Sequence, residues 1–298
     1  MPPVRGTQTL VDQMGWVMQR PGLILLEVAW RWCFGVPFLL VFARQARGIL
    51  RAVPLADTGF NNVDTLNPWV GAVQMVGVWE HYRAPVAAVL AWLVPVAACA
   101  WIVLSGVGRS LVLGRMESRM PLRPFSLIAL QAVWLALLGA TWWGWFRAIQ
   151  WVAATHITPD GNADLIGYSI WAIFLSLGFF TLWALVNWPV TVAPLLMLLE
   201  NRSPWSALAQ SFSLGKAFTG KLMEINLVMG IVNLMLIVLA MVISAAPLPF
   251  SDQLGTDTLH FIMIGATIFY LVGNDFFQIV RLKAFIEFWR TFRDAAPQ

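Results

Sequence analysis

Six long stretches of almost uninterrupted apolar residues decide what this chain can fold into. They cover residues 23–43, 86–106, 126–146, 166–199, 225–246 and 259–280. A helix that crosses a bilayer needs about 20 predominantly apolar residues, and each stretch is at least that long. A membrane-spanning β-barrel would instead show segments of about ten residues in which apolar and polar side chains alternate. The pattern therefore predicts an all-α protein, a polytopic transmembrane bundle of about six spanning helices.

The composition excludes a soluble domain. Hydrophobic residues make up 59% of the 298 residues and charged residues only 11%, whereas about a quarter of the residues of a soluble protein are charged. Two cysteines, Cys33 and Cys99, are too few to hold together a secreted fold of this size. The basic residues are dispersed among the loops, so the formal net charge of +4 does not indicate a nucleic-acid partner.

The charged residues outside the apolar stretches predict the orientation. If both termini are cytoplasmic, most of the 19 Lys and Arg residues lie on the cytoplasmic side, as the positive-inside rule requires. Five basic residues fall on the outer side, Arg83, Arg147 and the cluster Arg44, Arg47 and Arg51, and this cluster just after the first span is the feature that fits the rule least well. The first stretch begins after Pro21-Gly22 and is long enough to span, so we expect it to remain as a span and not to be removed as a signal peptide. The predicted organisation is a cytoplasmic amphipathic segment (1–22), a six-span transmembrane domain (23–280) and a basic cytoplasmic tail (281–298).

Three shorter segments are predicted to lie on the membrane surface as amphipathic helices. The first covers residues 7–19 and places Leu10, Met14 and Val17 on one face. The second begins at Asn67-Pro68, a capping residue followed by proline at the first helical position, and is expected to stop at Pro85.

The third surface helix begins at Ser203-Pro204, again a capping residue followed by proline. Its apolar face is predicted to contain Trp205, Leu208 and Phe212. Tryptophan is typical of the headgroup layer of a membrane. We expect all three helices to seat the protein on the membrane; lateral gates or partner-docking sites are the alternative.

The fourth apolar stretch is longer than a span requires. A continuous helix over residues 166–199 would be about 51 Å long, against a hydrocarbon core of about 30 Å. Pro189 and Pro194 mark the place where this helix is expected to kink or leave the membrane.

Polar residues inside the apolar stretches are the candidate site residues, because each is costly to place in a bilayer. They are Glu27, Arg31, Asn187, Glu224, Asn226, Asn233, Asn274 and Asp275. Nearly all fall in the cytoplasmic half of the bilayer in the predicted topology. We expect Arg31 to bond to Glu27, one turn away, or to Asp275 across the bundle. Such a cluster either sets helix order and register or lines a polar cavity of the kind a transporter needs.

The sequence contains no motif that supplies a catalytic centre. It has no P-loop, no G-x-S-x-G, no H-E-x-x-H and no C-x-x-C. His81, His156 and His260 fall on the predicted outer side, but no two of them have the spacing of metal ligands. We therefore expect no enzymatic activity, no cofactor and no metal. A membrane enzyme with an outer-face site at His156 and His260 is the alternative.

A resemblance to known membrane proteins rests on one segment. It reads Glu200-Asn201-Arg202-Ser203-Pro204-Trp205-Ser206-Ala207-Leu208, followed by Ser211-Phe212-Ser213-Leu214-Gly215-Lys216-Ala217-Phe218. This segment resembles a short amphipathic cytoplasmic helix in a superfamily of six-span bacterial membrane proteins, which includes the YciC-like proteins. The superfamily also includes the membrane domain attached to some glycerophosphodiester phosphodiesterases. The resemblance implies a membrane module of the bacterial inner membrane without hydrolase activity, since no soluble catalytic domain accompanies the match.

These observations together predict a non-catalytic integral inner-membrane protein with a structural or accessory role, or a role in membrane homeostasis. Its expected partners are the lipid bilayer and a second membrane protein. The alternative is a transporter or lipid-handling protein that uses a polar cavity in the cytoplasmic half of the bilayer.

Overall fold

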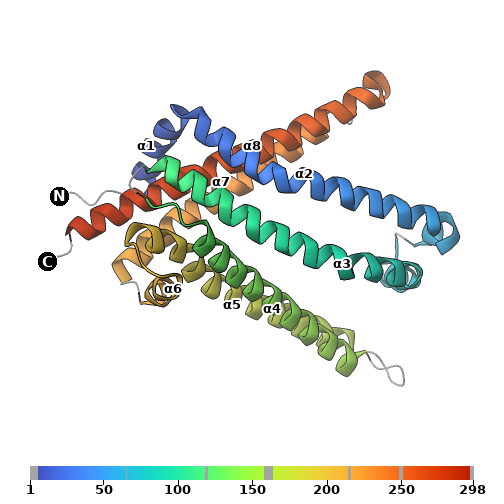
Figure 1. Ribbon diagram of the computed structural model, residues 1–298. Helices are drawn as coiled ribbons and strands as arrows, with labels where there is room; N and C mark the ends of the chain where they lie inside the picture. The colour runs from blue at the N-terminus through green and yellow to red at the C-terminus, as the bar shows by residue number, and fades with distance from the viewer. Residues whose placement is uncertain are drawn as a thin grey trace. The chain divides into compact units, whose positions relative to one another are not determined.

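The computed structural model describes residues 6–64, 66–117, 120–157, 164–213, 216–247 and 251–295, and within these ranges the regular secondary structure is helical (Figure 1). The helices are α1 (Gly6–Met18), α2 (Pro21–Ala52), α3 (Pro68–Met116), α4 (Pro124–His156), α5 (Leu165–Leu199), α6 (Pro204–Phe212), α7 (Lys216–Ala245) and α8 (Ser251–Ala295). Two short 3-10 helices, η1 (Leu55–Thr58) and η2 (Phe60–Asn62), lie between α2 and α3. The prediction of an all-α fold is confirmed.

Six helical segments of the described residues are long and apolar enough to cross a membrane. They are Pro21–Ala52, Gln74–Met116, Pro124–His156, Leu165–Leu199, Glu224–Ala245 and Gly255–Thr291. Few side chains in their most apolar windows are buried inside the protein, and in α5 none is. Apolar surface on this scale is stable only against lipid. The chain is therefore a multi-pass integral membrane protein.

The chain divides into two compact units. The hairpin unit, Trp30–Ser105, contains most of α2 and α3. The indole of Trp101 contacts Trp30 and Phe34 at one end of this hairpin, with ring centroids 5.9 and 5.1 Å apart. At the other end the Tyr82 hydroxyl donates a hydrogen bond to the carbonyl of Val53 (2.9 Å). The two helices of this unit are therefore antiparallel.

The first turn of α3 follows the capping signal, but the helix does not stop where the sequence predicts. It begins at Pro68 and continues through Pro85 and Pro95 to Met116. The expected stop at Pro85 is wrong, because a proline removes only one backbone hydrogen bond and membrane helices tolerate this loss.

The larger unit consists of Met1–Ala29 and Gly106–Gln298. In it α4 pairs with α5 and α7 pairs with α8, while α6 packs on α5 and α1 packs on both α7 and α8. Burial is concentrated where α5 and α8 end. Most residues from Pro189 to Leu198 in α5 are buried, and so are Leu282–Ile286 in α8. α1, α6 and the C-terminal end of α8 lie at the left of Figure 1.

The last turns of α3 approach α4 closely. Gly106, Ser110 and Gly114 are four residues apart and share one face of α3. A Cβ atom at Gly106 would lie 2.4 Å from Cγ1 of Ile128 and 2.8 Å from its backbone nitrogen. A Cβ atom at Gly114 would lie 2.8 Å from Cδ2 of Leu122. At Gly106 the absence of a side chain thus lets the backbone of α3 approach the backbone of α4, as is usual in membrane helix packing.

The predicted N-terminal surface helix forms at the expected place, as α1. Its apolar residues Leu10 and Val17 are buried, and the helix packs on α7 and α8. The apolar face of α1 thus contacts protein and not lipid. The segment expected as a tail is likewise structured, since α8 continues to Ala295 and residues such as Phe285 and Trp289 are buried.

Candidate functional site

Asn187 is used in the packing of α5 against α4. Its side-chain oxygen accepts a hydrogen bond from the indole nitrogen of Trp134 (2.8 Å), whose ring also contacts Trp183. The hydroxyl of Thr191 donates to the Asn187 carbonyl (2.8 Å). A second bond joins the same pair of helices further along, from the Trp145 indole nitrogen to the Ser176 hydroxyl (3.0 Å). These bonds tie α4 to α5.

Five predicted site residues lie on the neighbouring helices α7 and α8. Glu224, Asn226, Asn233 and Asn274 are half-buried and Asp275 is buried. A Cβ atom at Gly273 would lie 3.3 Å from Leu236, which places these two positions side by side. With a rise of about 1.5 Å per residue in paired antiparallel helices, Asn233 is level with residues close to Asp275, whereas Asn226 lies about 10 Å further along.

Asn233 also carries an unusual oxygen. Its side-chain oxygen is buried and has no hydrogen-bond partner among the described residues. A buried amide oxygen without a partner is destabilising, so such an atom calls for an explanation such as a bound water or ligand.

Glu27 and Arg31 belong to different units. Glu27 is buried in the part of α2 that belongs to the larger unit. Arg31 lies in the hairpin unit, where its guanidinium carbon is 5.4 Å from the ring centroid of Trp30. The expected bonds of Arg31 to Glu27 and to Asp275 remain predictions.

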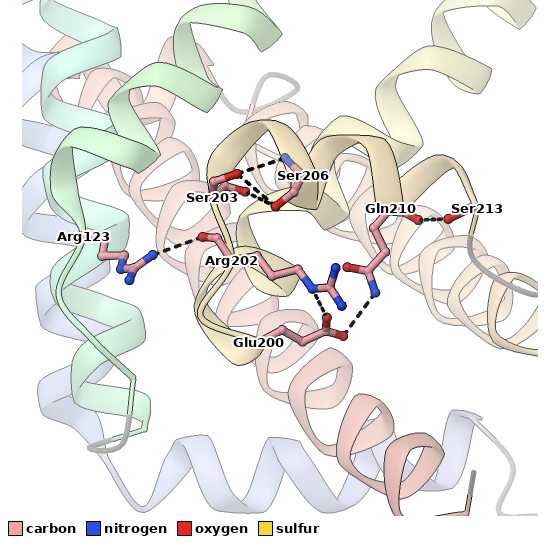
Figure 2. Close-up of polar contacts among 7 residues, drawn as sticks. All are labelled: Arg123, Glu200, Arg202, Ser203, Ser206, Gln210 and Ser213. Carbon is pink, nitrogen blue, oxygen red and sulfur yellow. Dashed lines mark hydrogen bonds and ion pairs between the residues drawn. The ribbon is translucent and has the colours of Figure 1, made fainter. Parts of the chain in front are cut away.

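The segment between α5 and α6 forms a polar junction that the sequence reasoning did not assemble (Figure 2). After Leu199, the backbone turns at Asn201, whose φ of 55° is left-handed; asparagine tolerates this conformation better than most residues. Ser203 then caps α6, because its hydroxyl oxygen accepts from the backbone N–H of Ser206 (3.3 Å). The predicted start of this helix at Ser203-Pro204 is confirmed.

Side chains from the residue before α4, the turn after α5, and α6 meet at this junction. The Arg123 guanidinium, just before α4, donates to the carbonyl of Arg202 (3.1 Å) and to the side-chain oxygen of Asn201 (2.5 Å). The Glu200 carboxylate accepts from Nε of Arg202 (2.6 Å) and from Nε2 of Gln210 (3.4 Å). Figure 2 shows Arg202 and Gln210 converging on Glu200 from two directions. These contacts hold α6 against the ends of α4 and α5.

The junction fixes which faces α6 presents. Ala207 and Ser211 are buried, and both are small, so α6 can lie close to its neighbours. Trp205 and Phe212, two of the three predicted apolar residues, are each 64% exposed. Leu214 and Gly215, within the segment that carries the resemblance, lie outside the described residues.

A charged network ties the end of α8 to other parts of the larger unit. The Glu287 carboxylate accepts from Lys283 and from Arg290 (3.5 Å), and Arg290 also pairs with Glu117. The spacing of Lys283, Glu287 and Arg290 is the signal in the sequence from which this network could have been predicted.

The same network holds α1. The Lys283 ammonium lies 4.7 Å from the ring centroid of Trp16, and the guanidinium carbon of Arg20 lies 3.8 Å from the same centroid. Two cations thus contact one indole ring, an arrangement that stabilises the docking of α1 on α8.

At the opposite end of α4 and α5, Asp164 bonds back to both helices. Its carboxylate accepts from the backbone N–H of Gly167 (2.8 Å), and His156 Nδ1 lies 3.3 Å from Oδ2. The bond from Gly167, and secondarily the histidine, holds the pKa of Asp164 below its ordinary value. His81 and His260 are exposed. Among the described residues no group of three or more His, Cys, Asp or Glu side chains is arranged to hold a metal ion.

Comparisons with known proteins found no relative of this chain. No protein-family model, curated protein or solved structure matches this chain.

Proposed function

We propose that this chain is a non-catalytic integral protein of the bacterial inner membrane with a structural or accessory role. The observation that supports the proposal most directly is the bond between Asn187 and Trp134. Asn187 was a candidate for lining a cavity, and its amide oxygen instead joins two spanning helices. The polar residues at the junction and at the end of α8 also bond to one another, which is the pattern of a protein whose polar groups stabilise its fold.

The proposed orientation places both termini in the cytoplasm. Basic residues of the larger unit that take part in the contacts described above gather at the end where α5 and α8 finish; they are Arg20, Arg123, Arg202, Lys283 and Arg290. The opposite end of α4 and α5 carries Asp164 instead. By the positive-inside rule the basic end is cytoplasmic. Reporter enzymes fused to the C-terminus test this, and an active periplasmic reporter there would refute the orientation.

The accessory role is tested by native mass spectrometry of the full chain extracted from its own membrane in mild detergent. We expect a stoichiometric protein partner. The control is Asp275→Asn, which should retain the partner because it leaves the exposed residues of α6 unchanged.

A second candidate is a transporter or lipid-handling protein, and the partnerless oxygen of Asn233 favours it. On this hypothesis a small molecule or lipid occupies the space between α7 and α8 near Asp275. A discrete mass that is lost from both Asp275→Asn and Asn233→Leu, without loss of folded protein, would replace the accessory role with this one. If neither a partner nor such a mass is found, the accessory proposal fails.

A further inference from the structure

We propose that α6 and the junction beside it form a site for the headgroups of anionic phospholipids, with Trp205 and Phe212 inserted at the membrane surface. The inference goes beyond the proposed function, because it concerns how the chain meets lipid and holds for either orientation of the protein. The residues that define this α6 surface are Arg123, Arg202, Trp205, Leu208 and Phe212.

Short connections to α5 and α7 limit where α6 can lie. Four residues separate the end of α5 at Leu199 from the start of α6 at Pro204, so the two helix ends lie at most about 18 Å apart. On the other side only three residues separate α6 from α7. Since α5 and α7 contain candidate spans, α6 lies close to the boundary of the bilayer.

The residues of α6 fall into three sectors around the helix axis. At 100° per residue, Leu208, Phe212 and Trp205 fall within a sector of about 60°. The buried residues Ala207 and Ser211 form a separate sector, and Ser206 with Gln210 forms a third, polar one. A helix that packs on protein by one sector and exposes an apolar and a polar sector has the pattern of a helix lying in the headgroup layer.

Hydrogen bonds hold α6 in a fixed position. The Ser203 cap, the Gln210–Glu200 bond and the Arg123 bonds hold both α6 and the turn before it. The two exposed aromatic side chains are therefore carried on a fixed helix, so they need not be ordered when they enter the membrane surface. Trp and Phe at this depth are typical of interfacial anchors.

The exposed surface of the junction is positively charged. The Arg202 side chain is 49% exposed, whereas the Glu200 carboxylate that it contacts is only 15% exposed. The junction thus covers its negative charge and presents its positive charge. A guanidinium group has five N–H donors, and Arg202 uses Nε for Glu200, so the outer nitrogens remain suited to a phosphate.

The insertion is tested by spin labelling. Cys33 and Cys99 are exposed and are replaced by alanine, after which Trp205→Cys, Phe212→Cys and, as the matched control on the polar sector, Ser206→Cys are labelled singly. The full chain is reconstituted in vesicles of phosphatidylcholine with phosphatidylglycerol. Labels at 205 and 212 should collide more with oxygen than with a water-soluble nickel chelate, and the label at 206 should show the reverse.

Two results would overturn the insertion. Equal accessibility to the chelate at all three positions would place the apolar sector in water. Protection of 205 and 212 from both reagents would place it against protein, either a second copy or a partner.

The contribution of the arginine charge to lipid binding is tested by native mass spectrometry. Phosphatidylglycerol is titrated into the full chain in detergent, and the bound lipid is measured. Arg202→Gln should weaken binding about fivefold, the effect of one basic residue near an anionic surface. Arg202→Lys keeps the positive charge and should bind more tightly than Arg202→Gln, which separates loss of charge from loss of fold. Arg83→Gln removes an exposed arginine elsewhere and should leave binding unchanged. Equal weakening by Arg83→Gln, or none by Arg202→Gln, would refute a headgroup site at this junction.

Discussion

The close approach of α3 and α4 at Gly106 gives the sharpest prediction about stability. Replacing Gly106 with alanine adds one methyl group whose carbon would lie 2.4 Å from Cγ1 of Ile128 and 2.8 and 2.9 Å from its backbone nitrogen and Cα. The Ile128 side chain can rotate, but its backbone cannot move without shifting α4. We therefore expect the two helices to separate by several tenths of an ångström, the displacement that relieves such contacts.

Two opposing terms determine how much Gly106→Ala changes the free energy of unfolding. Overpacking of a well-packed interior destabilises a protein by about 1–3 kcal/mol. Alanine favours the helix over glycine by up to about 1 kcal/mol. Gly77→Ala on the same helix measures the second term alone, because a Cβ atom there meets nothing within 4 Å. The difference between the two variants should thus be about 1–3 kcal/mol.

The measurement is thermal unfolding in detergent, followed by the fluorescence of the 17 tryptophans. At about 2 °C per kcal/mol for a chain of this size, Gly106→Ala should melt about 2–6 °C below Gly77→Ala. Ile128→Ala combined with Gly106→Ala should restore only part of this difference, because the backbone contact remains. Equal melting temperatures, or complete rescue by Ile128→Ala, would refute the argument from backbone contact.

Three further predictions concern the larger unit. Asn187→Leu and Ser176→Ala should each destabilise the α4–α5 pair by about 0.6 kcal/mol, the usual value of a hydrogen bond between membrane helices; because these positions are about 16 Å apart, their effects on unfolding in detergent should add. Trp16→Ala should release α1 and speed amide hydrogen exchange across Gly6–Met18 several-fold, whereas the exposed Trp79→Ala should not; equal exchange rates would contradict the docking of α1 through Lys283. The pKa of Asp164 is lowered in the folded protein, so its stabilising effect is present above its ordinary value of 3.8 and is lost as pH falls through the folded pKa. The gap in melting temperature between the wild type and Asp164→Ala should therefore be constant near neutral pH and shrink below about pH 4, and a gap that grows on acidification would contradict this sign.

The number of spans and the start of α6 could be read from the sequence, because both depend on local chemistry. Length and hydropathy identify a helix that crosses lipid, and a capping serine followed by proline identifies where a helix begins. The pair Trp134–Asn187 could not be read in this way. Many polar and aromatic residues lie in the apolar stretches, and only the packing of α4 on α5 selects these two as partners.

The contrast within α5 explains why the rest of the site escaped prediction. Both halves of this helix are strongly apolar, yet Phe174 and Leu185 are exposed, whereas Leu195 and Leu196 are buried. Lipid tails and protein interiors are about equally apolar, so hydropathy alone does not distinguish a face that meets lipid from one that meets protein. The same ambiguity hid the packing of α1, whose amphipathic pattern fits a membrane surface and a protein surface equally well. Polar side chains help to resolve it, because most buried polar groups are hydrogen-bonded. The contacts of Glu200, Arg202 and Lys283 therefore mark the end of the larger unit where its helices are held in place, and this is the end where α6 exposes Trp205 and Phe212.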